Sequence, residues 1–64
     1  MYMLSGFDPD TNEYLEQYFV DSENELAVHI ALRWAKTYRR PRLYYKTWNG
    51  IQAVAWKEVL RKAA

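Results

Sequence analysis

Residues 22–40 read SENELAVHIALRWAKTYRR, and this stretch decides the fold because its apolar residues recur at the helical period. We predict one amphipathic helix. Ser22 is the expected N-cap, with Glu25 completing a capping box. Pro41 disfavours the α conformation of the residue before it, so the helix should end near Arg40. The predicted buried stripe, with Trp34 as its core anchor, consists of Leu26, Ala27, Ile30, Ala31, Trp34, Ala35 and Tyr38.

Before the helix, residues 1–7 and 13–20 have strand-like composition on either side of a turn-forming cluster, Asp8-Pro9-Asp10-Thr11-Asn12. We predict a β-hairpin. Poor alternation in both arms leaves its register open, and we consider the register that pairs Phe7 with Tyr14. Both of its faces would be apolar, so the hairpin is either covered on two sides or carries an exposed apolar surface. The first face would carry Tyr2, Leu4, Leu15 and Phe19, and the second Met1, Met3, Tyr14, Tyr18 and Val20.

After the helix, residues 42–48 are rich in aromatics, and Asn49-Gly50 is a strong signal for a type I′ turn. A returning strand over residues 51–57 would place Trp48 opposite Ile51. The inner face would then carry Leu43, Tyr45, Val54 and Trp56. Residues 51–64 also fit a helical period, and we favour a strand with residues 58–64 as a short helical end.

The predicted fold is a small α+β domain, residues 1–64, with ββαββ order and one helix packed on an antiparallel sheet. The alternative is ββαβα with a C-terminal helix. A chain of 64 residues without cysteine has a small core and no disulfide. Its three Trp, six Tyr and two Phe supply buried area instead, and a homodimer is another way to cover the second hairpin face.

The charge is divided along the chain. Residues 1–25 hold seven acidic and no basic residues, whereas residues 26–64 hold all nine basic residues and one acidic residue, Glu58. Such asymmetry fits a basic binding face, complementary faces in a homo-oligomer, or an electric field that only orients the folded chain. Residues 1–10 lack the basic and apolar regions of a signal peptide, and no apolar run is long enough to span a bilayer. We therefore expect a soluble, cytoplasmic protein without membrane contact.

Catalytic and metal-binding patterns are not found in the sequence. Asp8, Asp10 and Asn12 have the spacing that begins an EF-hand loop, but Glu13 and Phe19 occupy the positions of its glycine and its bidentate glutamate. His29, the one histidine, falls on the polar side of the helix, and no nucleophile–base pair can be proposed from spacing. We expect neither an enzyme nor a bound metal or cofactor.

Residues 38–48, YRRPRLYYKTW, interleave basic and aromatic side chains. Cations neutralise phosphates and aromatic rings stack on unpaired bases. We therefore predict a non-catalytic binding protein that contacts nucleic acid, or another negatively charged partner. The candidate partner-binding residues are Arg33, Lys36, Arg39, Arg40, Arg42, Tyr44, Lys46 and Trp48.

A protein-binding inhibitor or adaptor is the alternative function. Tyr, Trp and Arg dominate the energetics of protein interfaces, and Val28 and Leu32 lie beside the predicted core stripe. A short chain of this kind, without an enzyme motif, is also typical of small phage-encoded proteins that block a host protein.

Overall fold

The computed structural model describes residues 1–63, which form four strands and two α-helices. The strands make one antiparallel sheet in the order β2-β1-β3-β4. The α+β class and the ββαββ order are confirmed, and a second helix follows. The elements are β1 (Tyr2–Phe7), β2 (Tyr14–Phe19), a 3₁₀ turn (Asp21–Glu23), α1 (Asn24–Thr37), β3 (Arg39–Thr47), β4 (Gly50–Val54) and α2 (Trp56–Ala63).

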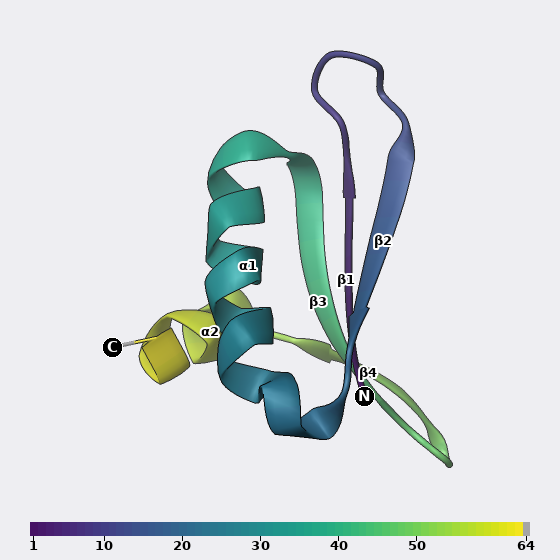
Figure 1. Ribbon diagram of the computed structural model, residues 1–64, viewed down its shortest axis with the longest axis vertical. Coiled ribbons are helices and arrows are strands. Elements are labelled where there is room, and N and C mark those ends of the chain that lie inside the picture. Colours follow the sequence, from purple (N-terminus) through teal and green to yellow (C-terminus); the bar gives the residue numbers. More distant parts are fainter. Residues whose placement is uncertain (64) are drawn as a thin grey trace.

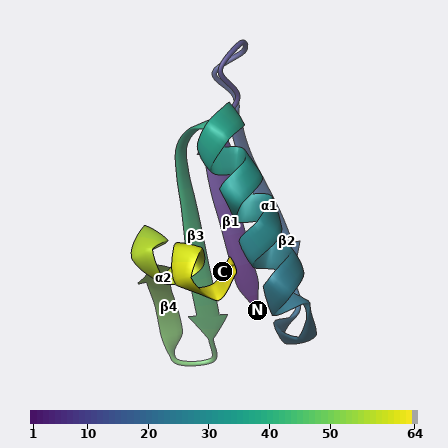
Figure 2. The same cartoon turned by 90° about the vertical axis from the view of Figure 1, so that its left-hand side faces the viewer.

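Both helices lie on the same side of the sheet (Figures 1 and 2). Leu4, Leu43 and Val59 are the largest fully buried side chains, and they come from β1, β3 and α2. The core thus lies between one sheet face and the two helices, and within residues 1–63 no helix covers the opposite face (Figure 1). The buried cluster is Leu4, Phe19, Ala27, Val28, Ala31, Leu43 and Val59.

The first helix is shorter than the sequence indicates. Glu23, not Ser22, is the N-cap of α1, and no side chain caps the helix. The capping interaction occurs one turn earlier, where the Val20 N–H donates to Glu23 Oε1 at 3.0 Å. At the other end Tyr38 is extended and its N–H donates to the Trp34 carbonyl. Arg39 and Arg40, predicted in the last helical turn, therefore begin β3.

The buried stripe of α1 is rotated towards α2. Val28 is buried and Leu26 is 46% exposed, the reverse of the prediction, and Ala35 is also exposed. The reason is that α2 packs alongside α1 and covers the Val28 flank. Trp34 is only partly buried and lies over Gly6, where an added Cβ would stand 3.1 Å from Trp34 Cε3. Glycine at that position lets the indole approach the strand.

In the first hairpin Phe7 pairs with Tyr14 and Tyr2 with Phe19, which is the register considered from the sequence. In its loop the Asp8 carboxylate accepts the backbone N–H groups of Asp10 and Thr11, at 2.8 and 3.1 Å. These bonds to the carboxylate, chiefly the one from Thr11, hold the pKa of Asp8 below its usual value. Asp8 thus acts as a turn former in the predicted way.

The second hairpin is shifted by two residues from its predicted register. Thr47 pairs with Gly50 and Leu43 with Val54, so Trp48 and Asn49 form the turn. A type I′ turn at Asn49-Gly50 is therefore wrong, and Gly50 instead has a φ of 152° at the start of β4. A shift of two leaves the side chains within β3 and β4 on their predicted faces, because strand side chains alternate with period two.

The chain after β4 is helical, and the prediction of a strand to residue 57 is wrong. The strand ends at Val54 and α2 begins at Trp56. Trp56, Val59 and Ala63 follow the helical period and pack on the core, which stabilises a helix over a longer strand. Residue 64 of the predicted helical end lies outside the described residues. None of the helices within residues 1–63 is long and apolar enough to cross a bilayer.

Candidate functional site on the open face of the sheet

We call the sheet side without helices the open face. Strand pairing arranges its side chains in rows across the sheet, with successive rows about 7 Å apart along the strands. One row is Tyr18, Met3, Tyr44 and Ala53, and the next is Glu16, Ser5 and Arg42. A third row pairs Tyr14 with Phe7 and Phe7 with Arg39. Aromatic and basic groups therefore share one surface.

On β2 the open face carries Tyr14, Glu16 and Tyr18 at alternate positions. The Tyr14 hydroxyl donates to Glu16 Oε2 at 2.8 Å, and the Tyr18 hydroxyl donates to Glu16 Oε1 at 3.0 Å. These hydrogen bonds are the main reason that the pKa values of Tyr14 and Tyr18 are raised. Both rings are about half exposed, at 53% and 48%, so their surfaces are available to a partner.

Cations flank these rings. Lys46 Nζ lies 5.8 Å from the centre of the Tyr18 ring, within the range of a cation–π contact. Arg42 and Arg39 are further cations on the open face of the same strand, β3. Within residues 1–63, the ion pairs join Met1 to Asp21 and Arg61 to Glu58, so the three cations of the open face are not neutralised by a carboxylate.

A hollow of about 240 Å³ lies near the first hairpin loop and is lined by Phe7, Asn12, Arg39 and Arg40. Beyond Ser5 the pairing of β1 and β3 is irregular, with Phe7 opposite Arg39, and Arg40 has a φ of 50°. Such a bulge redirects side chains. The result is two guanidinium groups beside one aromatic ring, a combination that suits an anion next to a flat group.

Trp48 lies in the turn between β3 and β4 and is 96% exposed. This hairpin extends away from the helices, on the side of the open face (Figure 1). Ile51, on the open face of β4, is 54% exposed. The end of the hairpin is therefore an uncovered apolar projection beside the basic and aromatic rows.

The predicted site residues divide between two sides of the molecule. Arg39, Arg42, Tyr44 and Lys46 lie together on the open face, with Arg40 at the bulge and Trp48 at the adjoining turn. Arg33 and Lys36 are exposed on α1, which covers the opposite face of the sheet. One flat partner cannot contact both groups at once.

Sequence reasoning missed the contribution of β2. Tyr14 and Tyr18 were placed on the second hairpin face, but neither they nor Glu16 were recognised as site residues. The signal was their alternation, since positions i, i+2 and i+4 of a strand share a face. What the sequence lacked was the strand order, which places β2 on the same surface as the basic strand β3 with only β1 between them.

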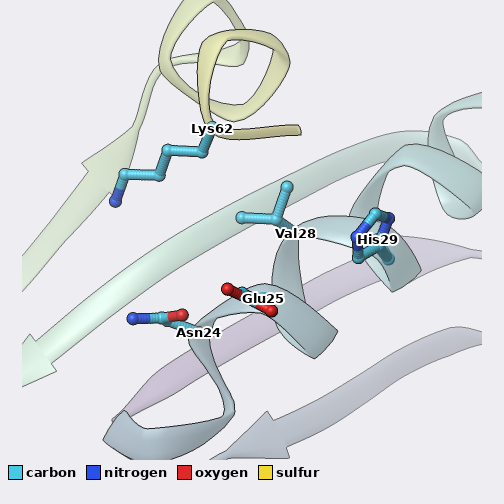
Figure 3. Close-up of a pocket in the computed structure, with 5 residues that line it drawn as sticks. All are labelled: Asn24, Glu25, Val28, His29 and Lys62. Atoms are coloured by element: carbon cyan, nitrogen blue, oxygen red, sulfur yellow. The ribbon is translucent and has the colours of Figure 1, made fainter. Parts of the chain in front are cut away.

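A second hollow, of about 490 Å³, lies between the helices (Figure 3). Asn24, Glu25, Val28 and His29 border it from α1, and Lys62 borders it from α2. His29 is exposed there, and in the described part of the chain no cluster of three or more His, Cys, Asp or Glu side chains could hold a metal ion. This hollow is remote from the rows of the open face because α1 and α2 lie on the other side of the sheet.

Comparison of the chain with protein-family models, with curated proteins and with solved structures finds no match.

Proposed function

We propose that this protein is a non-catalytic binding protein whose open face holds single-stranded nucleic acid. The observation that supports the proposal is that both helices cover one side of the sheet and leave Tyr14, Tyr18 and Tyr44 on the other, beside cations without ion-pair partners in residues 1–63. Rings stack on unpaired bases regardless of sequence, and cations neutralise the phosphates between them.

The exposed rings of this surface favour a single strand over a duplex. A duplex keeps its base faces stacked inside, so it could not use exposed tyrosine rings, and its major groove admits a helix or a two-stranded ribbon rather than a broad sheet. A single strand can turn successive bases onto successive rows of the sheet. The hollow between Arg39 and Arg40 then suits a phosphate at one end of the strand.

Two double variants test the proposal because they remove the same charge from opposite sides. Arg42→Ala with Lys46→Ala changes the open face, and Arg33→Ala with Lys36→Ala changes the exposed surface of α1. The measurement is fluorescence anisotropy of a labelled oligothymidylate over a range of salt concentrations. The association constant is plotted against the salt concentration on logarithmic axes. Phosphate contacts from Arg39, Arg42 and Lys46 predict a slope of about −2 for a single strand. The open-face variant should reduce the slope to below about 1 in magnitude, and the α1 variant should leave it unchanged.

Equal effects of the two variants would mean that only net charge matters and would contradict a specific role of the open face. Absence of binding at low salt would reject nucleic acid as the partner. The almost fully exposed Trp48 favours a second candidate in that case, a protein-binding inhibitor or adaptor. Its affinity would depend on Trp48 and Ile51 rather than on salt, since a few apolar truncations carry most of the energy of a protein interface.

A further inference from the structure

Glu16 is an unexpected residue on a surface proposed to bind phosphates. It lies in the middle of β2, one row from Tyr14 and one row from Tyr18 along the strand, and in the same row as Arg42. A carboxylate repels a phosphate, so it would weaken binding if it faced the nucleic-acid backbone. Because Glu16 lies between two rings that are proposed to stack on bases, its carboxylate is placed to contact the edge of a base instead.

The two tyrosine hydroxyls fix which lone pairs of Glu16 remain free. An ionised carboxylate has about four acceptor sites, two on each oxygen. Tyr14 occupies one on Oε2 and Tyr18 occupies one on Oε1. Each oxygen therefore keeps one acceptor site. With one free site on each oxygen, the carboxylate can accept two parallel N–H groups from one planar partner.

We infer that Glu16 selects guanine, an inference that rests on the proposed function and adds a base preference to it. The Watson–Crick edge of guanine carries two adjacent donors, the N1–H and the N2 amine. Cytosine and adenine carry one amine beside an acceptor nitrogen, which would face the second carboxylate oxygen. Thymine and uracil carry a single N–H between two carbonyl groups. Guanine alone satisfies both free sites, while its ring stacks on a neighbouring tyrosine.

The test uses labelled oligothymidylates with one variable base at the centre, because a single guanine cannot form a quadruplex. The central base is guanine, hypoxanthine, adenine or thymine. Guanine should bind about tenfold more tightly than thymine, within the range of one good bidentate contact. Hypoxanthine lacks the N2 amine and should lose most of this preference. The hypoxanthine comparison needs no variant, so it stands even if a substitution disturbs folding.

Glu16→Gln should remove the guanine preference, because an amide replaces one acceptor oxygen by a donor, and it should retain or strengthen binding to oligothymidylate. Glu13→Gln is the matched control: it makes the same charge change at an exposed loop residue that precedes β2 and should leave the preference intact. Binding without a preference for guanine, or a preference that survives in Glu16→Gln, would overturn the inference and leave the proposed function standing. No binding to any of these strands would overturn both.

Discussion

Tyr18 contributes to the open face through both parts of its side chain. Its ring lies beside Lys46 Nζ, and its hydroxyl is held by Glu16. The hydroxyl bond orients a half-exposed ring that would otherwise change rotamer freely, and an oriented ring loses less entropy when a base stacks on it. The same argument applies to Tyr14, which also contacts Phe7 with ring centroids 5.3 Å apart.

At this scale we predict that Tyr18→Ala weakens binding to oligothymidylate by about 1–3 kcal/mol, the usual cost of losing one stacking ring. Tyr18→Phe keeps the ring and loses only the hydroxyl bond, so it should retain most of the affinity. Anisotropy titrations of both variants measure the difference, and urea unfolding checks that they remain folded. If Tyr18→Phe is as weak as Tyr18→Ala, the ring does not stack and the hydroxyl is the essential group.

Among the elements, α2 completes the core. Val59 is fully buried between the helices and the sheet, whereas its neighbour Leu60 is 60% exposed. The helix is short, and isolated helices of this length are marginal in water. Its stability therefore comes from packing against α1 and from the burial of Trp56, Val59 and Ala63.

We predict that Val59→Ala lowers the free energy of unfolding by roughly 2–3 kcal/mol, near the lower end of the cost of large-to-small core changes. Leu60→Ala removes more atoms from an exposed site and should change it by less than about 0.5 kcal/mol. Urea unfolding followed by tryptophan fluorescence gives both values. Since a chain of this size is stable by only about 3–10 kcal/mol, the first loss is large. Similar changes in the free energy of unfolding for the two variants would mean that α2 does not pack on the core.

Across the whole molecule, nucleic-acid binding and self-association are two proposed uses of the open face, and they would respond to salt in opposite ways. Its half-exposed Tyr14 and Tyr18 and exposed Ile51 are an apolar surface that a second copy could cover, and the homodimer stays a prediction. In such a dimer, Arg39, Arg42 and Lys46 of one copy would lie close to the same cations of the other copy. Their repulsion is screened by salt, whereas phosphate contacts weaken as salt rises.

We therefore predict that any self-association through the open face strengthens with salt, while oligonucleotide binding weakens. Sedimentation at increasing salt, with and without oligothymidylate, measures both. Adding oligothymidylate at low salt should return a dimer to monomer, because the oligonucleotide and the second copy of the chain compete for one surface. A dimer that binds the strand without dissociating would locate its interface elsewhere, for example at the outer surfaces of the helices.

Local patterns in the sequence were sufficient for much of the fold. The first hairpin followed from its turn cluster and strand-like arms, and the central helix followed from its period. Poor alternation in both arms left the Phe7–Tyr14 register to be decided by the structure. The faces of the second hairpin were also correct, although its register was not, because a shift of two residues preserves alternation. The residues of β3 that carry the basic and aromatic groups were likewise evident from composition.

The sequence by itself determined the element order, the first hairpin and the chemical character of residues 38–48. Tertiary structure decided where β4 ended and α2 began, because burial of Val59 outweighed a local preference shared by strand and helix. It also decided which predicted residues could act together. Pairing of β1 with β3 brought Tyr14, Glu16 and Tyr18 onto the surface of Arg42 and Lys46, while α1 carried Arg33 and Lys36 to the opposite side. Strand order depends on contacts between residues far apart in the chain, and no local pattern encodes those contacts.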